Sequence, residues 1–280
     1  MTQFLLFRVY GPLVSWGDIA VGERRPTADR PSRSAILGLV AGALGIERSD
    51  HEMLTALRGG VGMACCVEIP GRLLHDYHTA QAPKEACTKE QEKRWKGKVR
   101  ADGPLWTRAE ELSPARDELS TILSERAYLA DTLAIVALWL RNQDAPMTLT
   151  DLAQALRRPV FVPYLGRKSC PPALPFAPRI VDADHPISAL QQADFAGDEA
   201  KALQPVLRAR EWPGKVLRTP FEPPVPRQFA WEGQWQAQPE LAETMSVQRR
   251  DEPGQRAAWQ FHTRVEQVAH EGGAQETNHG

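Results

Sequence analysis

Cationic side chains gather in three short segments of the sequence, and each segment carries groups that could hold a phosphate. The first, residues 24–34, has four arginines and one acid and leads into an apolar run that starts after Ser34. If a helix begins here, its first backbone N–H groups and the Arg33 guanidinium could together hold one phosphate. The alternative is a solvated loop whose arginines pair with neighbouring carboxylates.

The second segment, residues 163–171, reads P-Y-L-G-R-K-S-C-P and combines an aromatic ring, a glycine and two adjacent cations. Such a set suits a nucleotide chain, because a base can stack on Tyr164 while Arg167 and Lys168 face a phosphate. A nucleoside-triphosphate P-loop is excluded, since its upstream glycine is replaced by Phe161 and the G-K-S order is interrupted. The alternative is a tight turn with exposed cations.

The third segment, residues 93–100, holds five cations among eight residues and contains no acid. Cations of this kind could grip a sugar–phosphate backbone without reading its sequence, and the alternative is a solvated loop. The residues concerned are Lys93, Arg94, Trp95, Lys96, Lys98 and Arg100.

Titratable side chains are densest in the segment His75-Asp76-Tyr77-His78. In a strand, residues three apart point to opposite faces, so the two histidines would not share a metal ion. Tyr77 and His78 could in principle act as acid and base in RNA cleavage, although an ordinary strand end is the simpler interpretation. The sequence has no G-x-S-x-G motif and no cysteine in a nucleophile context.

The elements that must position these residues follow the order β-α-α-β-β-…-β-β-α. This order favours an α+β fold over a doubly wound parallel sheet. Capping residues favour a helix over 34–45, with Ser32 or Ser34 at its start and Gly45 at its end, and two further helices at 49–60 and 148–158. Apolar runs predict strands at 4–9, 61–69, 72–79, 121–128 and 133–140.

Composition limits the class of protein. Thirty-four cations and 35 acids leave a net charge of −1, so a uniformly basic coat is excluded. The longest apolar run, residues 35–46, is too short to span a membrane. Four cysteines without a C-x-x-C pair favour a reducing cytoplasm and no structural zinc.

Four stretches, in the same order and at similar spacing, resemble the Cas-five family of CRISPR-associated proteins, a branch of the RAMP superfamily, in its type I-E Cascade form. They are L-L-F-R-V-Y-G-P-L-V-S-W-G at 5–17, R-P-T at 25–27 with P-S-R-S-A-I-L-G-L at 31–39, R-L-L-H-D-Y-H-T at 72–79, and Y-L-G-R-K-S-C-P at 164–171. The resemblance extends over about residues 3–230.

The resemblance implies a RAMP fold, in which an RRM-like (ferredoxin-like) core carries a hairpin insertion, the thumb, and a small C-terminal β subdomain. We therefore expect a core over residues 1–160 with the thumb at about 80–120. We expect a C-terminal subdomain over 161–235, where prolines are dense, and a weakly ordered polar tail over 236–280.

The resemblance also implies a function, which is to cap one end of Cascade by holding the 5′ handle of the CRISPR RNA in antiviral defence. The implied protein partners are the CasC backbone subunit and the CasA large subunit, with target DNA reached only through the complex, no membrane and no cofactor. The RNA-binding residues would be Arg25, Arg33, Ser34, Arg126, Tyr164, Leu165, Gly166, Arg167, Lys168 and Ser169, together with the cations of 93–100 in the thumb.

An enzyme of a different class is the alternative. Some Cas-five relatives cleave the CRISPR precursor RNA without a metal, using a tyrosine and an adjacent Lys-His pair. This sequence contains no Lys-His dipeptide, so we expect no catalytic and no metal-binding residues. A pure protein scaffold would leave the arginine and Y-L-G-R-K segments without a purpose.

Overall fold

The computed structural model describes residues 1–84, 112, 119–142, 146–193, 226–233, 235, 241, 244–254 and 261–271. The chain forms two compact units. The first comprises Met1–Ile19, Pro26–Leu74 and Tyr128–Gly280, and the second comprises Ala20–Arg25 and His75–Ala127.

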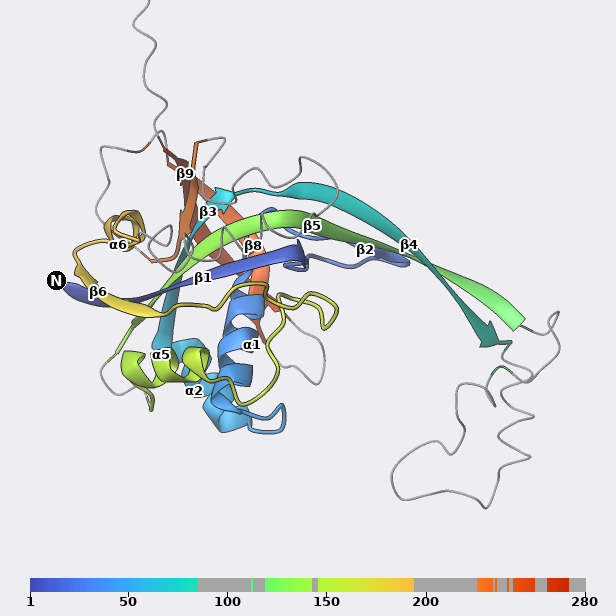
Figure 1. Ribbon diagram of the computed structural model, residues 1–280, viewed down its shortest axis with the longest axis horizontal. Coiled ribbons are helices and arrows are strands. Elements are labelled where there is room, and N and C mark those ends of the chain that lie inside the picture. Colours follow the sequence, from blue (N-terminus) through green and yellow to red (C-terminus); the bar gives the residue numbers. More distant parts are fainter. Residues whose placement is uncertain are drawn as a thin grey trace, which may run out of the picture. The chain divides into compact units, whose positions relative to one another are not determined.

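Runs of consecutive strands are separated by helices along the chain, as expected for an α+β fold (Figure 1). In chain order they are β1 (Thr2–Val14), β2 (Arg24–Arg25), α1 (Arg33–Leu44), α2 (His51–Gly60), β3 (Val61–Ile69), β4 (Arg72–Pro83), β5 (Leu119–Leu140), α5 (Leu149–Arg157), β6 (Arg179–Ala183), α6 (Pro186–Gln191), β7 (Gln228–Trp231), β8 (Met245–Pro253) and β9 (Phe261–His270).

The first unit is built on an antiparallel sheet with the strand order β6-β1-β5-β3-β7-β9-β8. Every pairing along this path is antiparallel, with Leu5 opposite Leu138 of β5 on one side and Ile180 of β6 on the other. The structure therefore confirms a mixed α and β fold with an antiparallel sheet.

Side chains alternate between the two faces of this sheet, and both faces are buried. Leu5, Phe7 and Val9 face a core formed with α1, α2 and α5, whereas Phe4 and Leu6 face a second core that includes α6. Figure 1 shows α1, α2 and α5 together on one side of the strands. The period of two in β1 is what divides the core into two layers.

The predicted capping residues of α1 are confirmed, and the structure selects between the two candidate serines. Ser32, not Ser34, is the N-cap and accepts a bond from the Ala35 N–H, and Gly45 ends the helix in the left-handed conformation. A Cβ added at Gly42 would meet no atom within 4 Å, so close packing does not explain this glycine.

The C-terminal region differs most from its prediction. Residues 245–253 and 261–270, expected to belong to a weakly ordered tail, form the paired strands β8 and β9. Val268 and Ala269 of β9 are buried in the two cores. The polar sequence concealed these strands because many of their charged side chains are paired with other charges.

The second unit contains the outer parts of β4 and β5, which pair with each other, and β2, which pairs in parallel with β5. The two strands predicted at 121–128 and 133–140 are one 22-residue strand, in which Asp131 adopts a positive φ of 55°. The predicted thumb cations at 93–100 lie outside the described residues.

Membrane insertion through a helix is not indicated. Within the residues that the structure describes, no helix combines the length and the apolar character that a membrane span requires.

His185 is a buried histidine at the start of α6. It is 3% exposed, and its Nδ1 accepts a hydrogen bond from the Ile187 N–H at 3.1 Å. The rings of Trp231 and Trp235 lie 5.9 and 5.6 Å from the imidazole. Burial lowers the pKa of His185 to about 4, so the ring stays neutral at physiological pH.

This histidine predicts a loss of stability in mild acid. Between its ordinary pKa of 6.5 and about 4, the unfolded chain protonates His185 and the folded chain does not. The free energy of unfolding should therefore fall as the pH drops through this window, by on the order of 3 kcal/mol. Urea unfolding at several pH values measures it. His185→Asn keeps a cap acceptor and should flatten the dependence, and an unchanged slope in that variant contradicts the assignment.

Candidate nucleic-acid interface

The Tyr164–Ser169 turn is fixed to the end of β1 by backbone hydrogen bonds. The Leu165 carbonyl accepts from the Ser15 N–H at 3.1 Å, and the Leu165 N–H donates to the Cys170 carbonyl at 2.7 Å. Tyr164, Lys168 and Ser169 are exposed. The turn therefore presents a ring, an ammonium group and a hydroxyl on a rigid backbone.

Two residues of this turn serve the fold. The Leu165 side chain is 1% exposed and packs in the main core, so the prediction that it contacts RNA is wrong for the side chain. Gly166 has a φ of 86°, and a Cβ there would lie 1.6 Å from the Ser15 carbonyl oxygen. The glycine is required by this approach of the chain to itself, whether or not RNA is present.

Arg167 is held by an aromatic ring. Its guanidinium carbon lies 4.6 Å from the centre of the Tyr128 ring, within the range of a cation–π interaction. The side chain is half-buried, whereas the neighbouring Lys168 is exposed. Of the two adjacent cations, Lys168 is thus the more accessible to a phosphate.

Arg33 has a different environment from the one predicted. Its side chain is fully buried, with its guanidinium 2.5 Å from Glu232 and 2.6 Å from Glu252. The same group donates to the carbonyl oxygens of Arg58 and Val61 at 2.6 and 2.8 Å. The prediction that Arg33 binds RNA is therefore wrong, because these partners enclose it.

The start of α1 is also occupied by a group of the chain itself. An Asp251 carboxylate oxygen on β8 accepts from the Arg33 N–H at 2.8 Å, where we expected a phosphate. Burial alone would raise the pKa of Asp251. The hydrogen bond from Arg264 and the positive charge of that residue outweigh burial and hold this pKa below its ordinary value. Ser34 is partly buried, with its hydroxyl 3.3 Å from that of Ser32. Asp251 therefore occupies the position where we expected a phosphate, and RNA contact by the Ser34 side chain stays a prediction.

These contacts belong to an ion-pair network that the sequence analysis missed. Arg30 donates to Glu266 at 2.9 Å, Arg264 to Asp251 at 2.6 Å and to Glu266 at 2.7 Å. The ion-pair network consists of five arginines and five carboxylates, namely Arg30, Arg33, Arg141, Arg249, Arg264, Asp29, Glu232, Asp251, Glu252 and Glu266. Charged residues spaced two apart, at 249 and 251 and at 264 and 266, have the period of a strand and could have indicated the network.

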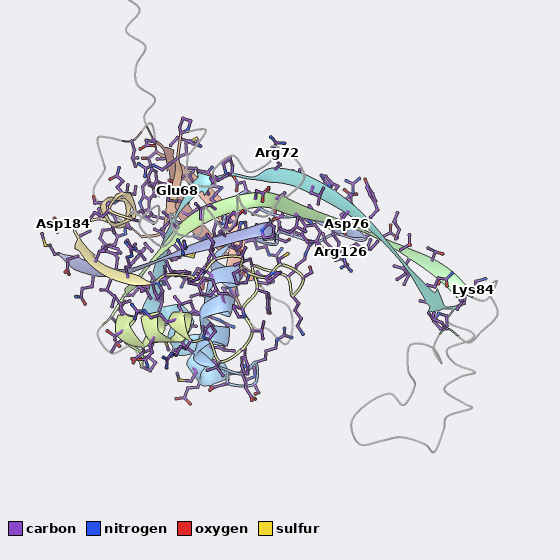
Figure 2. The ribbon with its side chains drawn as sticks, viewed as in Figure 1. Glu68, Arg72, Asp76, Lys84, Arg126 and Asp184 are labelled. Atoms are coloured by element: carbon purple, nitrogen blue, oxygen red, sulfur yellow. The ribbon has the colours of Figure 1, made fainter. Side chains whose placement is uncertain are left out.

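In the second unit, two predicted RNA-binding arginines are register partners on adjacent strands. Arg25 of β2 pairs with Arg126 of β5. The Arg25 guanidinium donates to the Gly22 and Arg24 carbonyls at 2.5 and 2.9 Å, and Arg126 Nε donates to the Ser124 hydroxyl at 3.3 Å. Figure 2 labels Arg126, which lies on β5. The parallel pairing of β2 with β5 thus makes these two cations neighbours across the strands.

The titratable segment on β4 is arranged as separate pairs. His75 Nδ1 lies 2.7 Å from Glu125 Oε1, and His78 pairs with Asp76. Tyr77 is 65% exposed. Within the described ranges, no group of three or more His, Cys, Asp and Glu side chains could hold a metal ion.

Comparison with known proteins identifies the family. A family model described as "CRISPR-associated protein (Cas_Cas5)" matches residues 4–264, and the chain belongs to this family. The chain is 31% identical over 246 residues to "CRISPR system Cascade subunit CasD" of Escherichia coli (strain K12). The aligned region covers 82% of this chain and 93% of that protein.

Solved structures have a similar fold. One titled "CRISPR RNA-guided surveillance complex" has a TM-score of 0.57 at 22% identity and covers 96% of this chain and 90% of its own. Another, "Crystal structure of Cas protein", has a TM-score of 0.50 at 25% identity and covers 96% of this chain and 95% of its own.

Two glycines provide a test of the turn. Gly166→Ala should lower the free energy of unfolding by at least about 2 kcal/mol, because the methyl group cannot fit against Ser15. Gly42→Ala is the matched control and should raise it by about 0.5–1 kcal/mol, since helix propensity improves at an open position. Urea unfolding measures both, and a neutral Gly166→Ala would contradict the close approach.

Arg33→Met tests the ion-pair network. Removing the guanidinium leaves the buried Glu232 with Arg141 but without its fully buried partner, so the free energy of unfolding should fall by about 3–5 kcal/mol. The exposed Arg25 serves as the control, and Arg25→Met should change stability by less than about 0.5 kcal/mol. If Arg33→Met keeps full stability and loses only RNA affinity, the structural role is wrong.

Proposed function

We propose that this chain is a subunit of a Cascade complex in CRISPR defence, where it binds the 5′ handle of the CRISPR RNA and caps one end of the assembly. The observation that carries the proposal is the rigid turn at 164–169, which exposes Tyr164, Lys168 and Ser169. A ring and a cation on a fixed backbone suit an unpaired RNA end, since stacking and charge require no particular sequence. Arg167 adds a second positive charge beside them.

The opposed arginines of the second unit are a separate phosphate contact in this proposal. Arg25 and Arg126 are neighbours across the two strands, so one phosphate beside this register position could pair with both of them. Neither residue needs to move from its strand to make the contact.

The finer description of the fold belongs to the same proposal. The antiparallel sheet with its helices supports a RAMP-type, ferredoxin-like core over residues 1–160. The paired strands β4 and β5 support a thumb at about 80–120, whose cations Lys93, Arg94, Lys96, Lys98 and Arg100, together with Trp95, would grip the guide. Residues 161–235, expected to form a C-terminal subdomain, would extend this core, because β6 and β7 pair with β1 and β3 in the same sheet.

The proposed protein partners follow from the relatives. The matched E. coli protein is named a Cascade subunit, and this supports neighbours equivalent to the CasC backbone and the CasA large subunit. Target DNA would be reached only through the assembled complex, and the compartment would be the cytoplasm.

The proposed role is binding without catalysis. Metal-free cleavage of precursor RNA is the second candidate, and the exposed Tyr77 next to His78 is the observation that favours it. His78 pairs with Asp76, and the sequence supplies no Lys-His dipeptide beside it. Incubation of the purified chain with repeat RNA should give retention without cuts, and specific cuts would favour the enzyme.

Lys168→Ala tests the turn by its salt dependence. Handle-RNA affinity should fall steeply with salt, and the variant should reduce the log–log slope by about 0.7, the share of one phosphate contact on a single strand. Thermal stability should not change, because Lys168 is exposed. Arg250→Ala, at an exposed position on β8, is the control and should keep the wild-type slope. An unchanged slope in Lys168→Ala would contradict the site.

A further inference from the structure

Three consecutive apolar side chains stand in solvent just before the Tyr164 turn. Val160, Phe161 and Val162 are 66%, 46% and 86% exposed, and Pro159 and Pro163 flank them. We call residues 159–163 the apolar strip. Single exposed apolar residues are ordinary on a protein surface, whereas a contiguous group of them marks an interaction surface.

The backbone of the apolar strip is fixed. The Val160 N–H donates to the Ala43 carbonyl at 3.0 Å, and the Phe161 N–H donates to the Gly42 carbonyl at 3.1 Å. These carbonyls belong to the last turn of α1, and the Gly42 carbonyl also accepts from the Gly45 N–H at 3.2 Å. The Val160 side chain also packs closely against Gly45, because a Cβ built on that glycine would lie only 3.0–3.2 Å from it. The strip is thus preorganised and would lose little entropy on docking.

Cations outnumber acids in the stretch of sequence that contains the apolar strip. Residues 152–181 contain no Asp or Glu, and they contain five cations, Arg157, Arg158, Arg167, Lys168 and Arg179. Glu47 and Arg48, which follow the end of α1, add no net charge. A partner that covers the strip would therefore bind most favourably if carboxylates bordered its contact surface.

We propose that the apolar strip docks into an apolar groove, bordered by carboxylates, on another protein subunit of the same complex. The aliphatic side chains favour a protein over RNA, because Val160 and Val162 are the most exposed members and offer no ring for a base to stack on. The inference rests on the proposed membership of a multisubunit complex but not on the RNA-binding turn.

Competitive incorporation tests the proposal. Wild-type and variant full-length chains with different tags are co-expressed with the other subunits and a CRISPR RNA, and the complex is purified through a tag on another subunit. The double variant Val160→Ser, Val162→Ser should be depleted about tenfold relative to its share in the lysate, since two valines lose their burial in the complex. Val21→Ser, at a 73% exposed valine outside the strip, is the matched control and should be incorporated normally.

Charge at Val162 tests the predicted border of the groove. Val162→Asp should be depleted more strongly than Val162→Lys, because the partner surface is acidic. Equal depletion of these two variants, or normal incorporation of the double serine variant, overturns the proposal.

Measurements on the free chain distinguish the other groups that could cover the apolar strip. The double serine variant should keep wild-type handle-RNA affinity, thermal stability and monomeric state. Loss of RNA affinity would assign the strip to the RNA path, a lower unfolding temperature would assign it to contacts within this chain, and a wild-type dimer that the variant abolishes would assign it to a second copy. Each of these results overturns docking to another subunit. Failure of wild-type RNA binding would instead count against the proposed function and leave the incorporation result intact.

Discussion

The ion-pair network is the interaction on which the arrangement of the first unit depends. Five arginines and five carboxylates balance, so charges that would be costly to bury singly are mutually compensated. Arg33 and its partners Glu232 and Asp251 join the start of α1 to the end of β7 and to β8, more than 190 residues later. Arg264 links Asp251 to β9. An apolar contact would hold these elements together equally well, but charges with fixed partners accept only one register.

The position of the exposed turn follows from this register through a short series of hydrogen bonds. Ser32, the residue before Arg33, donates to the Trp16 carbonyl at 2.6 Å, and the Trp16 N–H donates to the Thr27 hydroxyl at 3.0 Å. Ser15, next in the chain, holds both Leu165 and Gly166. The groups that face solvent at Tyr164 and Lys168 are therefore aligned by contacts within the chain. The same short motif thus carries both the residues that fix the turn and the residues that we propose for RNA binding.

Sequence reasoning located most elements of the first 160 residues, because helix caps and apolar periods are local signals. It also found the exposed turn, since P-Y-L-G-R-K-S-C-P is a short motif whose chemistry lies in adjacent residues. It failed for Arg33, which looks in one dimension like a surface cation next to Arg30 and is in three dimensions enclosed by acids from the end of the chain. It failed for β8 and β9 for the same reason, because charges read as solvated become core residues once their distant partners are present. In both cases the missing information is which distant charge each side chain pairs with, and no local sequence pattern contains it.

The strand order has a consequence for how the protein is made. β3 lies between β5 and β7, and β7 begins about 160 residues after β3 ends. At translation rates of about 5–20 residues per second, roughly 10–30 s pass between the synthesis of the two strands. During that time the β3 edge that carries Cys65, Cys66 and Val67 has no β7 to pair with, and an apolar edge of this kind invites association with other chains. Completion of the sheet is thus a late event in the life of the nascent chain, and the yield of folded protein depends on how well that edge is protected until the C-terminal strands emerge from the ribosome.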